Sequence, residues 1–182
     1  GVINANDKVD LGNGLPKYTF GFNFTLGYKG FDLSANFTGA AGFQIAQSYR
    51  DPSSSQANYS RRILNRWTGE GTSNEIPRVT YGDVGNWLFS DLYLQDGDYI
   101  RLQNLTLGYD FKKLIAWKGL SKMRLYFQVQ NLFTLTKYDG MDPEIGSFNG
   151  TDGNSSDSWV SGVDMGYYPH PRTFIVGLNL AF

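Results

Sequence analysis

The feature that most constrains the fold is a strict alternation of apolar and small polar residues in the stretch KYTFGFNFTLGYKGFDLSANFTGAAG, residues 17–42. Aromatic and aliphatic side chains occupy every second position over 18–28, and the same period resumes over 31–43. A period of two indicates strands with two different faces, and a two-residue link indicates a tight hairpin. In the link we expect Gly30 to adopt a positive φ angle. One face of the hairpin is therefore fatty, and the other carries Thr, Asn and Gly.

Further stretches repeat this alternation and predict strands at about 99–111, 123–135 and 171–182. Two positions interrupt the pattern. Arg101 and Gln103 share the parity of Leu105, so either this part of the strand lies beyond the apolar zone or a bulge shifts the register. In the next strand Asn131 interrupts the apolar positions. The sequence predicts an all-β fold with five antiparallel strands.

Composition excludes several classes of protein. The 182 residues contain no cysteine, which excludes disulfides and cysteine-based zinc sites. The net charge of −1 gives no indication of a nucleic-acid partner. No run of apolar residues is long enough to predict a transmembrane helix. A mean hydropathy of −0.36 is still compatible with membrane strands, because only alternate residues of such strands face lipid.

The connections between the predicted strands are alternately short and long. The link at 29–30 is short and that at 112–122 is of medium length, whereas 1–17, 44–98 and 136–169 are long enough to be extracellular loops. Compact soluble domains rarely repeat irregular loops longer than about 15 residues, but outer-membrane barrels combine short periplasmic turns with long external loops. Aromatic residues also gather near the short links, as in an interfacial girdle; they are Tyr28, Phe31, Tyr109, Phe111, Trp117 and Phe182. We therefore expect the fatty face to meet lipid and the polar face to meet water or a polar plug.

Two other kinds of protein share the alternation. A soluble β-sandwich that binds glycans would bury the Phe face and expose the Thr face, with Trp and Tyr as stacking platforms. An adhesin-type surface protein would use the same strands without transport. Dependence on detergent separates the membrane interpretation from both alternatives.

Several motifs resemble one known family. The stretches DGDYIRLQNLTLGYDF (96–111), LYFQVQNLFTLTKYDGMDPEIG (125–146) and YYPHPRTFIVGLNLAF (167–182) resemble the C-terminal part of SusC-like TonB-dependent outer-membrane transporters of Bacteroidetes. LNRWTGEG at 64–71, followed by IPRV at 76–79, is similar to a long external loop of that family. The resemblance implies a 22-stranded barrel in the outer membrane of a Gram-negative bacterium. It also implies a plug domain, which this chain lacks, so we expect the chain to be a segment of the transporter.

The same resemblance implies a function in transport. The family imports oligosaccharides or peptides under a lid formed by a SusD-like surface lipoprotein, and the TonB–ExbB–ExbD complex supplies energy through the plug. This chain would supply barrel wall and external loops, with lipid, the plug and the remaining barrel as neighbours. A final strand that ends in an aromatic residue, here Phe182, would also serve as an assembly signal.

Candidate functional residues lie in the predicted external loops. Aromatic and basic side chains can stack on a sugar or contact a lid; the candidates are Arg61, Arg62, Arg66, Trp67, Trp87 and Trp159. Two stretches rich in side-chain oxygens could bind calcium, but they lack EF-hand spacing, and their Asp, Asn and Gly residues are also typical of turns. They contain Asp139, Asp142 and Glu144, and Asp152, Asn154 and Asp157. The single histidine, His170, lies between two prolines without a visible catalytic partner set. We expect no enzyme activity, no cofactor, and a structural or rim position for His170.

Overall fold

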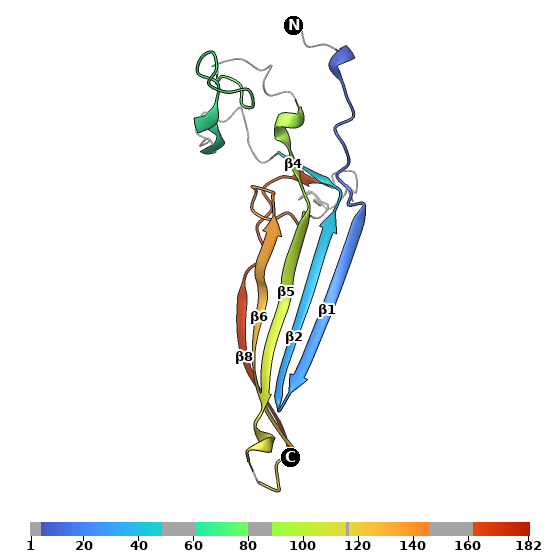
Figure 1. Ribbon diagram of the computed structural model, residues 1–182, viewed down its shortest axis with the longest axis vertical. Helices are drawn as coiled ribbons and strands as arrows, with labels where there is room; N and C mark the ends of the chain where they lie inside the picture. Colours follow the sequence, from blue (N-terminus) through green and yellow to red (C-terminus); the bar gives the residue numbers. More distant parts are fainter. Residues whose placement is uncertain (1–4, 49–60, 80–88, 116, 146–161) are drawn as a thin grey trace, which may run out of the picture. The chain divides into compact units, whose positions relative to one another are not determined.

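A computed structural model describes residues 5–48, 61–79, 89–115, 117–145 and 162–182 (Figure 1). In these residues the regular elements are strands and short 3₁₀ helices, which confirms the all-β prediction. No helix in this part of the chain is long and apolar enough to cross a membrane. The chain divides into two compact units. The sheet unit comprises Pro16–Phe43, Gly97–Glu144 and Tyr168–Phe182, and the loop unit comprises Gly1–Leu15, Gln44–Asp96 and Ile145–Tyr167.

The sheet unit is one antiparallel sheet of five strands (Figure 1). In spatial order the strands are β1 (Tyr18–Tyr28), β2 (Phe31–Ala41), β5 (Tyr99–Asp110), β6 (Lys122–Thr136) and β8 (Thr173–Ala181). Its turn end carries the β1–β2 hairpin and the short 3₁₀ helix η5 (Phe111–Lys113). Its loop end is where β2 and β6 finish and where β5 and β8 begin.

The hairpin at the turn end is a two-residue link. Gly30 has a φ of 94°, as expected from the sequence. Lys29 also has a positive φ, of 48°, which the sequence did not predict. Positive φ at both central residues matches the right-handed twist of the flanking strands. The backbone strain at Lys29 is therefore tolerated because this turn geometry joins two twisted strands in register.

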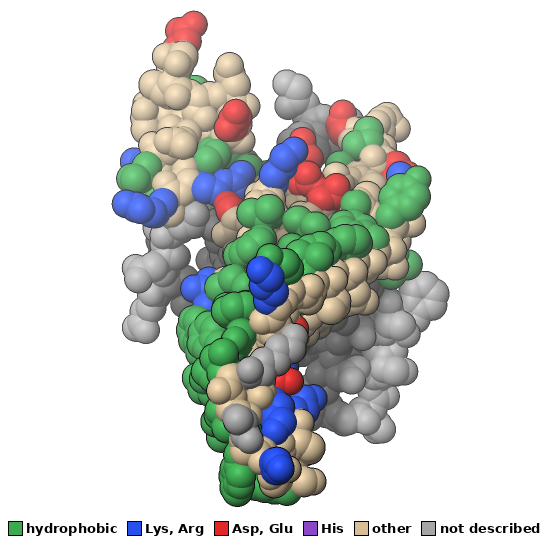
Figure 2. All heavy atoms as spheres, turned by 60° about the horizontal axis from the view of Figure 1, so that its bottom comes forward, with side chains coloured by type: hydrophobic (Ala, Val, Ile, Leu, Met, Phe, Trp, Pro, Cys, Tyr) green, Lys and Arg blue, Asp and Glu red, His purple; other side chains and the backbone are tan. Residues whose placement is uncertain are grey.

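The register sorts the side chains into two faces. One row across the sheet is apolar throughout and consists of Phe24, Ala35, Leu105, Val129 and Phe174. A neighbouring row on the other face is polar throughout and consists of Asn23, Asn36, Asn104, Gln130 and Thr173. Most large side chains of the apolar face are exposed, and Figure 2 shows hydrophobic side chains gathered in a band along one side of the strands. Large exposed apolar patches mark protein–protein or membrane interaction sites.

The break in the alternation of β5 is a bulge. The pairing of β2 with β5 shifts between Asn36 and Phe37, so that these residues pair with Asn104 and Leu102 and leave Gln103 as the extra residue. The extra residue moves Arg101 to the polar face and Leu102 to the apolar face. Of the two explanations that the sequence allowed, the bulge is the one observed.

The interruption at Asn131 lies opposite the same bulge. The β5–β6 pairing also shifts between Leu102 and Asn104, and Asn131 there has a φ of 51°. Asparagine tolerates this left-handed conformation better than most residues. Its amide donates a hydrogen bond of 3.1 Å to the carbonyl oxygen of Pro171. Asn131 therefore interrupts the apolar positions of β6 because the backbone is left-handed there.

Glycines on the polar face make room for one large ring. Gly177 pairs with Tyr126, and a Cβ atom at Gly177 would lie 2.2 Å from the tyrosine ring. Across the other neighbour, Gly108 leaves space for the Arg124 guanidinium to reach Asp32. The Arg124 guanidinium also lies over the Tyr126 ring at 5.0 Å. The small residues of this face therefore accommodate an Asp32–Arg124–Tyr126 cluster near the turn end.

The loop unit contains short strands that the sequence did not predict, and a 3₁₀ helix, η2 (Arg61–Asn65), within the range 59–67 where the sequence indicates a short helix. Its strand β3 (Gln44–Gln47) pairs antiparallel with β4 (Leu94–Asp96) and parallel with β7 (Val163–Asp164). Its other 3₁₀ helices are η1 (Ala5–Asp7) and η4 (Asp91–Tyr93). Strands of two to four residues are too short to show a period, so the segments 44–98 and 136–169 looked irregular.

Candidate functional site

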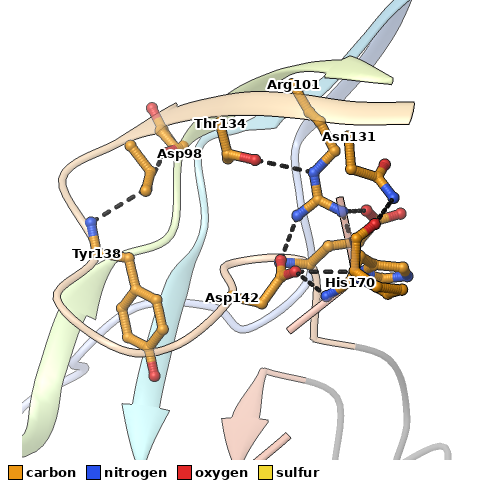
Figure 3. Close-up of polar contacts among 10 residues, drawn as sticks. Asp98, Arg101, Asn131, Thr134, Tyr138, Asp142 and His170 are labelled. Carbon is orange, nitrogen blue, oxygen red and sulfur yellow. Dashed lines mark hydrogen bonds and ion pairs between the residues drawn. The ribbon is translucent and has the colours of Figure 1, made fainter. Parts of the chain in front are cut away.

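A cluster of polar side chains at the loop end of the sheet unit surrounds Arg101 (Figure 3). The Arg101 side chain is almost completely buried. Nε donates to Thr134 Oγ1 at 3.0 Å, and Nη1 donates to Glu144 Oε2 at 2.8 Å. Nη2 donates to Asp142 Oδ1 in a short ion pair. Burying a guanidinium costs free energy unless it is paired and hydrogen-bonded, and these three partners meet that requirement.

Asp142 is the buried anion of this cluster. Besides Arg101, it accepts hydrogen bonds from the backbone N–H of Glu144 at 2.9 Å and of His170 at 3.1 Å. Burial by itself would raise the pKa of Asp142. The two backbone donors, the His170 side chain and the Arg101 charge outweigh burial, and the pKa of Asp142 is lowered below its ordinary value. The carboxylate therefore stays ionised at neutral pH.

His170 completes the cluster from the segment that leads into β8. Its Nδ1 lies 3.0 Å from Arg101 Nη1 and 3.1 Å from Asp142 Oδ2. A neutral ring that carries its proton on Nε2 accepts from Arg101, whereas a ring protonated on Nδ1 donates to Asp142. The ring is a third point of attachment, and it agrees with the structural position expected for His170.

The same residues raise the question of a metal ion. Ligand atoms of Asp142, Glu144 and His170 lie within 4.8 Å of one another, a spacing that could hold a cation. Both carboxylates, however, already form ion pairs with Arg101. The guanidinium supplies the positive charge that a calcium ion would bring. Calcium at this site stays a prediction, and the second oxygen-rich stretch, 152–157, lies outside the described residues.

A recess of about 230 Å³ adjoins the cluster. It is bounded by β6 and by the segments on either side of the long loop; polar residues that line it include Arg101, Asn131, Thr134, Asp142, His170 and Arg172. The sequence singled out Asp142, Glu144 and His170 separately but did not connect them with Arg101. The one sequence signal for Arg101 was its wrong parity in β5.

The loop candidates lie in the loop unit. Arg61 is the first residue of η2 and Arg66 follows its last residue, and Arg66 Nη1 donates to the Ile63 carbonyl oxygen at 3.1 Å. The backbone N–H of Trp67 donates to the Ile76 carbonyl oxygen at 2.8 Å, and the indole is partly exposed. These bonds close residues 61–76 into a compact loop, which presents Trp67 at the surface. A contact role for these residues stays a prediction.

The remaining candidates have different outcomes. Trp87 and Trp159 lie outside the described residues. Phe182 is strongly exposed, and its ring lies 6.2 Å from that of Trp117 in an edge-on arrangement at the turn end. Phe31, Tyr109 and Phe111 form a second group of rings there, with centroid distances of 4.4 and 4.8 Å. Five of the six aromatic residues expected near the short links thus form two groups of rings, whereas the assembly role of Phe182 stays a prediction.

Comparisons with known proteins agree on one family, although no family model matches the chain. TonB-dependent receptor P3 of Formosa agariphila is 36% identical over 184 residues, and TonB-dependent receptor SusC of Bacteroides thetaiotaomicron is 30% identical over 186 residues. Each match covers 100% of this chain, which spans 18% of the first relative and 17% of the second.

The fold is similar to solved structures of one transport system. A structure of the RagAB peptide transporter has a TM-score of 0.74 and 24% identity over 100% of this chain and 19% of that chain. The RagAB peptide importer in the closed-closed state has a TM-score of 0.72 and 25% identity over 96% of this chain and 18% of that chain. The relatives are named receptors and importers rather than enzymes. The chain belongs to the SusC-like TonB-dependent receptors, as the motifs in its sequence indicated.

Proposed function

We propose that this chain forms wall and rim of an outer-membrane transporter barrel. The observation that carries the proposal is the exposed apolar face of the sheet unit. Its strands have 9 to 15 residues, and outer-membrane strands of about 9–11 residues span a bilayer. Phe22, Phe24 and Leu178, which the sequence assigned to lipid, all lie exposed on this face. A soluble sandwich would bury these side chains.

The two edges of the sheet support a larger assembly. Within the described residues, β1 pairs only with β2, and β8 pairs only with β6. Open strand edges leave backbone N–H and C=O groups without partners, which hydrocarbon does not tolerate. Five strands therefore need further strands to close, and the 22-stranded barrel of the family, with a plug in its lumen, supplies them in this proposal.

The polar face then lines the lumen. Its Asn, Thr and Gln residues suit contact with water, solute or plug. The Asp32–Arg124 pair lies on this face, with hydrogen bonds of 2.8 Å and 2.5 Å. Charged side chains on the lipid face of a barrel are destabilising, whereas the lumen accepts them. The distribution of charge supports the proposed orientation.

The names of the relatives support a proposal for solute and partners. The RagAB structures are named as those of a peptide transporter or importer. We propose that the whole protein imports peptides or oligosaccharides with energy from the TonB–ExbB–ExbD complex, and that a SusD-like lipoprotein covers its external mouth. In this account Trp67, Arg61 and Arg66 contact the lid or the solute.

Uptake in living cells tests the proposal. Cells that express the whole protein are offered fluorescent peptides and oligosaccharides, with and without a functional TonB. We expect one of the two solute classes to accumulate only when TonB is present. The matched control is a strain that lacks the transporter. Accumulation of neither class, or equal accumulation without TonB, would contradict the proposed function.

A further inference from the structure

The loop end of the sheet has an incomplete edge. The β5–β6 pairing extends to Tyr99 opposite Thr136, but the β6–β8 pairing stops at Gln130 opposite Thr173. Residues 131–136 of β6 therefore have a neighbouring strand on one side only. Segments 137–144 and 168–172 approach the sheet here, as their bonds to Arg101 and Asn131 show (Figure 3).

Several of the bonds that hold these segments pass through one side chain, Arg101. Arg101 lies on β5 and bonds to Thr134 on β6, to Asp142 and Glu144 in the segment after β6, and to His170 in the segment before β8. These partners are 33 to 69 residues distant in sequence. Asp142 repeats the connection, because it accepts from the backbone of His170. One guanidinium therefore joins four separate segments.

We propose that Arg101 is a positioning residue that locks segments 137–144 and 168–172 in one arrangement at the external mouth. The proposal rests on the transport function proposed above. The locked segments expose two large side chains, Met141 and Tyr168. With the lock in place these side chains stay in a fixed geometry for a solute or lid. Without the bonds to Arg101 the two segments sample other positions, and the binding of a solute or lid must then order them again.

The burial of the Arg101–Asp142 pair suits a lock rather than a hinge. Arg101 and Asp142 are both nearly inaccessible to water, with side-chain exposures of 3% and 5%. An exposed ion pair exchanges easily with water, whereas separating a buried pair leaves charges without partners. The arrangement therefore has few intermediate positions. The Asp32–Arg124 pair, with exposures of 20% and 37%, lacks this property and serves as the matched control.

A spin label at Met141→Cys measures the order of the locked segment directly. The chain contains no cysteine, so the substitution places a single thiol in it. In the assembled outer-membrane protein we expect an immobilised spectrum for the labelled parent. Arg101→Met should give a mobile spectrum, and Arg101→Lys an intermediate one. Arg124→Met should leave the spectrum unchanged. An immobilised label in Arg101→Met would overturn the proposal.

Two further variants apply if Arg101→Met fails to assemble. Glu144→Gln weakens the bond between Arg101 and the side chain at position 144, and it keeps the Arg101–Asp142 ion pair. Arg101→Met with Asp142→Asn removes both buried charges, which avoids an unpaired buried charge. Both should assemble and should show increased mobility at Met141→Cys. Parent-like spectra in both would overturn the proposal.

Uptake kinetics separate positioning from general damage. In Glu144→Gln we expect a several-fold rise in the solute concentration that gives half-maximal uptake, with the maximal rate per assembled barrel unchanged. A fall in the maximal rate alone would contradict positioning. If the parent shows no uptake, the proposed function fails, but the spin-label comparison still decides whether the lock exists.

Discussion

Each end of the sheet contains an arginine that pairs with a carboxylate, but the two pairs differ in how deeply they are buried. At the turn end, Arg124 pairs with Asp32 across neighbouring strands, and both side chains remain partly exposed. At the loop end, Arg101 is buried and has partners in several segments. The turn end needs no lock, because a two-residue hairpin already fixes the chain. The loop end has to place long connections, and there a buried charge joins segments that are far apart in sequence.

Removal of the buried guanidinium should have the largest effect. Arg101→Met leaves Asp142 without its counter-ion, and breaking a buried pair costs about 3–5 kcal/mol. The midpoint of urea unfolding in lipid vesicles should fall accordingly, with the same m-value. A loss below about 1 kcal/mol, as for a surface pair, would mean that the cluster is not buried in the assembled protein.

Acidification should lower the free energy of unfolding, because Asp142 at the loop end loses its charge. The pKa of Asp142 is lowered in the folded state, so its contribution to stability is present above the ordinary carboxyl pKa of 3.8. That contribution is lost as the pH falls through the lowered folded pKa. Protonation removes the charge but keeps the side chain, so the effect should be smaller than that of Arg101→Met. Unfolding midpoints from pH 7 downwards measure it, and an identical pH profile for Asp142→Asn would contradict the assignment.

A substitution in the hairpin at the turn end should have a moderate effect on the yield of folded protein. Gly30→Val places a β-branched residue at a φ of 94°, a conformation that costs of the order of 1–3 kcal/mol. We expect a lower yield of folded barrel on heat-modifiable gel mobility. Gly30→Asn is the matched control, since asparagine tolerates positive φ better. Equal yields for the two variants would show that the turn geometry differs in the assembled protein.

Removal of the exposed guanidinium should have the smallest effect. Arg124→Met breaks a partly exposed pair, for which we expect about 0–1 kcal/mol. The same urea titration measures the loss. If Arg124→Met costs as much as Arg101→Met, a part of the protein beyond this chain covers Asp32 and Arg124. That result would remove the contrast between the two ends.

The sequence predicted the sheet far better than the site. Alternation located the strands because each has one fatty face, and the residues assigned to lipid do share a face. The parity of Arg101 left two explanations open, since sequence cannot distinguish a bulge from the end of the apolar zone. The Arg101 cluster could not be predicted, because its carboxylate partners are 41 and 43 residues distant and lie in segments without a period. The short strands β3, β4 and β7 were missed for the same lack of a period.

The central claim is that the alternation separates a lipid face from a lumen face, and a pair of adjacent substitutions tests it most directly. Phe24→Arg places a charge on the apolar face, where it should cost about 2–4 kcal/mol near the bilayer midplane. Asn23→Arg places the same charge on the polar face of the same strand. The measurement is the folded, heat-modifiable fraction in outer membranes. We expect a marked loss for Phe24→Arg and near-parent levels for Asn23→Arg. Equal tolerance, or a greater loss for Asn23→Arg, would contradict the assignment of the two faces.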